Sequence, residues 1–150
     1  MDERKQISLK HLFSPSGGLF YHFRALRYAR TLWTSFREEL EEYLQSWNPP
    51  EKELVILGAS AGYTLTSEFL NRFDKLWLFD PDPLARILFR RNHPDLNCIW
   101  SSEDLIFANG EYSHSRLSDW LCEHKNVAVL FSNILGQLPL LHSNLEAMQS

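Results

Sequence analysis

The chain has 150 residues, 44% of them hydrophobic, and a formal net charge of −4 at neutral pH. This hydrophobic content is enough to bury the core of one folded domain, so it excludes a disordered or fibrous chain. The negative charge gives no general attraction to polyanions, and composition therefore does not favour nucleic-acid binding. A small molecule or a protein is the better expectation for a binding partner.

Sequence features indicate a reducing, cytoplasmic location. The N-terminal residues lack the charged-then-apolar order of a signal peptide, and no apolar run approaches the roughly 20 residues that span a bilayer. We therefore expect no membrane contact. Cys98 and Cys122 form no CxxC pair, and the histidines show no HxxxH or HExxH spacing. These patterns predict reduced thiols and no metal site.

Residues 1–50 are expected to form a helical segment before the main domain. From Leu19 to Trp47, apolar residues recur every three or four positions, apart from one step that Ala29 bridges. This spacing predicts a single long helix. The sequence Asn-Pro-Pro at 48–50 then ends it, because proline lacks an amide donor and restrains the residue before it.

Residues 51–150 alternate between buried strands and helices. Apolar runs without polar alternation are typical of strands buried on both faces, and four occur, at 53–58, 75–80, 96–100 and 126–131. Helices are expected at 63–73, from Pro83 to Asn92 with Asp82 as the N-cap, at 118–124, and finally from Pro139. This alternation predicts an α/β fold, a Rossmann-like parallel sheet of about four strands with helices on both faces.

The end of the first predicted strand is the expected ligand site. In parallel sheets, ligands bind at the carboxyl ends of the strands, beside the point where the strand order reverses. Gly58 and Gly62 follow the first strand, where they permit a tight turn and a close approach of the backbone to a ligand. Asp80 ends the second strand, at the separation from which an acid reaches the ribose hydroxyls of a nucleotide bound over that turn.

Two motifs around these residues resemble class I S-adenosylmethionine-dependent methyltransferases. The sequences VILGASAGYTL at 55–65 and LWLFDPDP at 76–83 are similar to the first two motifs of that family. The resemblance implies that the glycine-rich turn faces the methionine part of S-adenosylmethionine and that Asp80 holds the ribose. Ser60 stands where the family has the middle glycine of GxGxG, and its side chain could fill space or donate a hydrogen bond to the ligand.

Two later segments agree with this resemblance in their position. The sequence SSEDLIF follows the third strand, and the resemblance implies that Asp104 or Glu103 lies near the adenine. The sequence FSNILGQLP follows the fourth strand, which places Ser132, Asn133 and Gln137 at the border of cofactor and acceptor. The implied reaction is methyl transfer to an unidentified acceptor. Because the sulfonium already activates the methyl group, the catalytic residues stay unknown at this point.

The number of strands departs from the family pattern. The family sheet has seven strands, whereas only four are predicted before Ser150. We therefore expect a domain that is incomplete at its C-terminal end, or a partner that completes it. A homo-oligomer through the edge of the fourth strand is one such arrangement, because an uncovered strand offers unpaired backbone groups.

The predicted N-terminal helix carries further candidates. His22 and Tyr28 could close over the carboxylate of the cofactor, as N-terminal elements do in some methyltransferases, with packing as the alternative role. Arg24, Arg27 and Arg30 recur every three residues. We interpret these arginines as a solvated flank, with an anion-binding stripe as the alternative.

Two other functions remain open. The turn is also similar to the TGxxxGxG turn of short-chain dehydrogenases, but Leu57 and Thr64 occupy the positions of the flanking threonine and the last glycine. Tyr112 is followed four residues later by Arg116 and not by the lysine that those enzymes use. A nicotinamide-dependent oxidoreductase is therefore less favoured. The second alternative is a non-catalytic module that retains the Rossmann-like fold for assembly.

Overall fold

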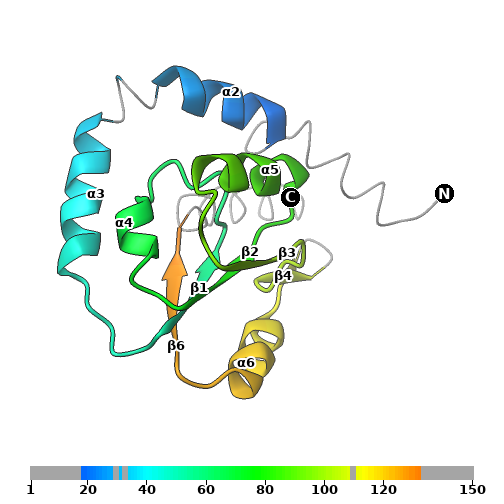
Figure 1. Ribbon diagram of the computed structural model, residues 1–150. Helices are drawn as coiled ribbons and strands as arrows, with labels where there is room; N and C mark the ends of the chain where they lie inside the picture. Colours follow the sequence, from blue (N-terminus) through cyan, green and yellow to red (C-terminus); the bar gives the residue numbers. More distant parts are fainter. Residues whose placement is uncertain (1–17, 29–30, 32–33, 109–110, 133–150) are drawn as a thin grey trace, which may run out of the picture.

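The structure, a computed structural model, describes residues 18–28, 31, 34–108 and 111–132. Its centre is a parallel sheet with the strand order β3-β2-β1-β6 (Figure 1). The strands are β1 (Glu53–Leu57), β2 (Lys75–Phe79), β3 (Cys98–Ser101) and β6 (Val127–Phe131). They match the four apolar runs, and the predicted α/β class is confirmed. The strand order reverses between β1 and β6, which makes this pair the switch point of the sheet.

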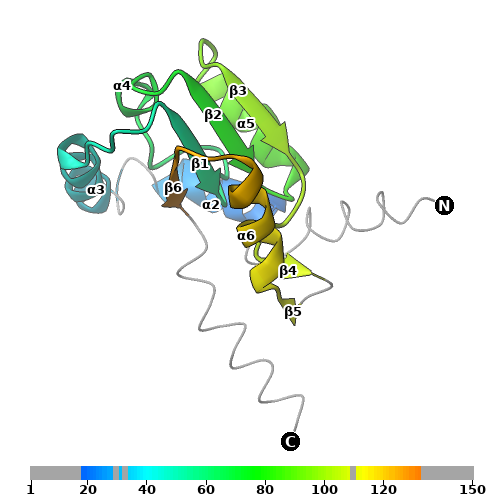
Figure 2. The same ribbon diagram turned by 90° about the horizontal axis from the view of Figure 1, so that it is seen from below.

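Alternate residues of the strands build two separate cores. Leu54 and Ile56 face a layer formed by α3 (Thr34–Ser46), α4 (Ser67–Leu70) and α5 (Pro83–Asn92). Val55 and Leu57 face the opposite layer, which contains α6 (His114–Glu123). Figure 2 shows α5 and α6 on opposite sides of the sheet. Side chains alternate between the faces of a strand, so a continuous apolar run is needed to serve both cores.

The N-terminal segment forms two helices in place of the predicted single one. α2 (Gly18–Tyr28) and α3 point in different directions in Figure 1. At Thr31, both the backbone amide and the side-chain hydroxyl donate to the carbonyl of Tyr28, at 3.0 and 3.4 Å. These bonds span three residues and compete with continued helical bonding, which a periodic apolar pattern does not reveal. Among the described helices, none is both long and apolar enough to cross a membrane.

Three further elements differ from the sequence-based expectation. The helix predicted at 118–124 is α6, which begins earlier, at His114. The helix predicted at 63–73 is only α4, which begins after Thr66, whose hydroxyl accepts from the amide of Phe69 at 3.3 Å. The preceding residues form a turn, in which the amide of Leu65 donates to the carbonyl of Gly62 at 3.1 Å. A short antiparallel hairpin of β4 (Phe107–Ala108) and β5 (Glu111–Tyr112) was not predicted. The helix predicted from Pro139 lies outside the described residues.

Replacement of Gly62 tests how tightly this fold is packed around its first turn. Gly62 has a φ of +67°, and an added Cβ would lie 2.8 Å from His93 Nε2 and 2.9 Å from Phe89 Cε2. We expect Gly62→Ala to lower the free energy of unfolding by about 2–4 kcal/mol, because strained backbone and overpacking add. The matched control is Asn126→Ala, at a φ of +64°; it changes only the backbone preference and should cost about 1 kcal/mol. Urea denaturation measures both, and equal losses would contradict the steric argument.

Candidate functional site

Buried polar side chains gather around the turn after β1. In the part of the chain that the structure describes, five polar or charged residues are buried: His22, Ser60, Asp80, Asp82 and His93. Each of them belongs to this turn, bonds to it, or bonds to the loop after β2. Because burying a polar group is costly unless it is bonded, their concentration at one place marks the candidate site.

The backbone of the turn adopts positive φ angles at every second residue. The values are 69° at Gly58, 49° at Ser60 and 67° at Gly62. Glycine adopts this conformation without strain, which explains its presence at two of the three positions. Ser60 adopts the same conformation although it carries a side chain, at a cost of about 1–2 kcal/mol.

Asp80 is fixed directly against this turn. Its Oδ2 accepts a hydrogen bond from the amide of Ser60 at 2.8 Å, and its Oδ1 accepts one from the amide of Asp82 at 2.9 Å. Asp80 therefore lies next to the turn after β1, as the sequence predicted. Burial raises the pKa of Asp80 to about 6, although the two backbone donors act in the opposite direction.

The carboxylate of Asp80 still has capacity for further hydrogen bonds. An ionised carboxylate offers about four acceptor sites, and the backbone of Ser60 and Asp82 uses two of them. Because Asp80 is only 8% exposed, water satisfies the remaining sites poorly. A vicinal diol, such as that of a ribose, carries the two donors that these sites would accept.

Helix α2 is attached to the site through His22. The Nε2 atom of His22 lies 2.9 Å from Asp82 Oδ2, and its Nδ1 atom lies 3.2 Å from the hydroxyl of Tyr63. Asp82 also caps α5, as predicted, because its Oδ1 accepts from the amide of Leu84 at 2.9 Å. Of the two residues expected to close over the cofactor, His22 reaches the site, whereas Tyr28 lies beneath the guanidinium of Arg27, 5.6 Å from it.

The opposite side of the turn rests on the C-terminal end of α5. His93 Nδ1 lies 2.6 Å from Ser67 Oγ, and its Nε2 lies 3.3 Å from the carbonyl oxygen of Gly62. Asn92 donates to the carbonyl of Ala61 at 2.9 Å. Burial lowers the pKa of His93, so the neutral ring is favoured, with one nitrogen as donor and the other as acceptor. No sequence pattern indicates these contacts beyond the predicted end of the helix at Asn92.

The other predicted ligand residues lie near the same edge of the sheet. Asp104 follows β3, and its Oδ1 accepts from the amides of Ile106 and Phe107, both at 2.9 Å. Its side chain therefore stabilises the loop that leads into β4. Glu103 is exposed. The amide of Ser132 donates to the carbonyl of Leu57 at 3.0 Å, which places Ser132 beside the start of the turn. Asn133 and Gln137 lie outside the described residues.

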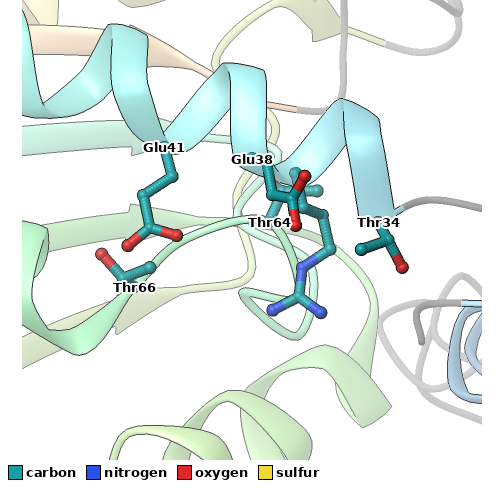
Figure 3. A pocket seen from close by; sticks show the side chains of 6 residues that line it. Thr34, Glu38, Glu41, Thr64 and Thr66 are labelled. Carbon is teal, nitrogen blue, oxygen red and sulfur yellow. The ribbon is translucent and has the colours of Figure 1, made fainter.

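A separate cavity of about 210 Å³ lies between α3 and the loop after the turn (Figure 3). Its lining consists of Thr34, Arg37, Glu38, Glu41, Thr64 and Thr66. Figure 3 shows Glu41 and Thr66 facing each other across it. None of the predicted cofactor residues lines this cavity, so we place the candidate site at the Asp80 contact and not here. No grouping of three or more His, Cys, Asp or Glu side chains that could hold a metal ion occurs within the described ranges.

Comparison with known proteins adds no identification. No family model and no curated protein matches the chain.

The raised pKa of Asp80 predicts how stability depends on pH. Folding raises this pKa from 3.8 to about 6, so the folded state holds the proton more tightly. The contribution of Asp80 to stability is therefore fully present below about pH 4 and is lost as the pH rises through 6. The two-unit shift corresponds to about 3 kcal/mol.

The measurement compares the unmodified chain with Asp80→Asn, whose amide does not ionise. Between about pH 4 and pH 7.5, the unmodified chain should lose about 3 kcal/mol of unfolding free energy relative to the variant. Asp119→Asn, at an exposed position of α6, should keep the pH profile of the unmodified chain. Parallel profiles for Asp80→Asn and the unmodified chain would contradict the prediction.

Proposed function

We propose that this chain binds S-adenosylmethionine across the carboxyl ends of β1 and β2 and transfers its methyl group to an acceptor. The observation that supports this most directly is the Asp80 carboxylate, fixed at 2.8 Å from the amide of Ser60 in the turn after β1. The turn and the acid thereby form one rigid surface at neighbouring strand ends. A nucleoside spans these two points when its ribose lies over the acid.

The position of each residue at the carboxyl edge of the sheet indicates which part of the cofactor it would contact. The hydroxyls of the ribose would donate to the unused acceptor sites of Asp80. The backbone from Gly58 to Gly62 would lie beneath the methionine part, close to the switch point between β1 and β6. Asp104 would approach the adenine from the end of β3, and Ser132 would border the cofactor from the end of β6.

The chemistry of the donor explains why a dedicated catalytic pair is not required. The sulfonium of S-adenosylmethionine makes its methyl group electrophilic before the protein acts. The task of the protein is to hold the donor and the nucleophile in line and in contact, which removes much of the entropic barrier. A rigid turn, braced by Asp80 on one side and by the end of α5 on the other, suits this task.

Assembly without catalysis is the second candidate function. Large apolar side chains of α2 and α3 are exposed, among them Phe23 at 66% and Tyr43 at 62%. Surfaces of this kind mark contacts between proteins. The two functions are compatible, because the exposed side chains and the polar site are formed by different residues.

Calorimetric titration with S-adenosylhomocysteine tests the proposal. We expect saturable binding to the full chain, and a loss of affinity of about 10- to 100-fold in Asp80→Asn, because hydrogen bonds to a charged acceptor are lost. Asp119→Asn serves as the matched control and should bind like the unmodified chain. Absence of both heat and thermal shift at millimolar ligand would exclude the proposal. Binding of NADH with no binding of S-adenosylhomocysteine would favour an oxidoreductase instead.

A further inference from the structure

Among the described side chains of helix α2, two face inward and three large apolar ones face outward. His22 and Ala25 are buried, at 3% and 0% exposure. Leu19, Phe23 and Leu26 are 52%, 66% and 62% exposed. Their spacing of four and three residues places them on one stripe of the helix. Large apolar side chains of a surface helix ordinarily face the core, so this α2 stripe (Leu19, Phe23, Leu26) is a candidate contact surface.

Helix α3 carries a second exposed stripe beside its buried face. Leu44 on α3 is buried in the core, and Leu40 packs partly against that core. Phe36 and Tyr43 are 56% and 62% exposed. These two residues, the α3 stripe, are seven positions apart, which brings them onto one side of the helix. Glu39 lies between them, three residues from one and four from the other.

The two stripes have opposite charges along their borders. Helix α2 contains no acidic residue, and its exposed Arg27 follows Phe23 by one helical turn. Helix α3 contains four glutamates and a single arginine, with the exposed Glu39 inside its stripe. Two α2 stripes placed together would bring arginines together, and two α3 stripes would bring glutamates together. The crossed pair, α2 against α3, joins apolar to apolar and cation to anion.

We propose that two copies of the chain associate with the α2 stripe of each copy against the α3 stripe of the other. A two-fold axis generates the crossed contact twice, which closes the assembly as a dimer. In each contact, Arg27 would lie near Glu39 of the partner subunit. This inference goes beyond methyl transfer and does not rest on it. It has one structural consequence for the site, because α2 also carries His22 and would be held over Asp82 by the dimer contact.

Light scattering after size-exclusion chromatography tests the association on the full chain at several concentrations. We expect a mass of twice the 17.6 kDa of one chain. Phe23→Ser should raise the dissociation constant by about tenfold or more, since a central aromatic contact is lost. The matched control is Ile87→Ser on α5, where the side chain is 64% exposed and outside both stripes. A monomer at all concentrations, or equal effects of the two substitutions, would overturn the proposal.

Charge reversal tests the crossed pairing itself. Arg27→Glu and Glu39→Arg should each weaken the dimer, because each places like charges across both contacts. The double variant should restore the dimer, and circular dichroism checks that every variant is folded. Failure of the double variant to recover would overturn the proposal. So would loss of the dimer only in Phe131→Ser, which would assign it to the edge of β6. Co-sedimentation of a monomer with anionic lipid vesicles would assign the α2 stripe to a membrane surface instead.

Discussion

The carboxylate of Asp80 connects the parts of the molecule that meet at the carboxyl edge of the sheet. One oxygen bonds the amide of Ser60 in the turn after β1, and the other bonds the amide of Asp82 in the loop after β2. Asp82 in turn caps α5 and bonds His22 on α2. The strained turn, the start of α5 and the position of α2 therefore depend on a series of contacts that begins at one side chain. Without its two acceptors, buried amides in both loops would be left unpaired.

Asp80 and His93 differ in how much of their hydrogen-bonding capacity the protein itself uses. Both side chains are buried next to the same turn, and both have a pKa shifted towards the neutral form by burial. The two ring nitrogens of His93 each have a partner, in Ser67 and in the carbonyl of Gly62, which uses the full capacity of a neutral imidazole. Asp80 has two partners and about four acceptor sites. The difference makes His93 a structural residue and leaves Asp80 able to receive a ligand.

Local sequence patterns correctly predicted the strands and the start of α5, because these depend on interactions between residues close together in the chain. The four strands follow from apolar runs, and the start of α5 follows from Asp82 before Pro83, whose side chain caps the helix as expected. The break at Thr31 and the late start of α4 at Ser67 were missed, because local hydrogen bonds of Thr31 and Thr66 interrupt or begin a helix without disturbing the apolar period. The polar contacts of the site join residues far apart: His22 and Asp82 are separated by 60 positions, and Ser67 and His93 by 26. No local pattern encodes such pairs.

The orientation of α2 shows why periodicity alone is an incomplete guide. The spacing of its apolar residues identifies a helix with one apolar side, and the usual inference is that this side faces the core. Here the hydrogen bonds of His22 to Asp82 and Tyr63 fix the other side inward, next to the small Ala25. The apolar side is left outward as a direct consequence. The contacts of one buried histidine thus bring α2 over the loop after β2 and leave Leu19, Phe23 and Leu26 on the exposed side of the helix. A substitution on the exposed side of α2 that shifts the helix should therefore also change the contacts of His22 with Asp82 and Tyr63.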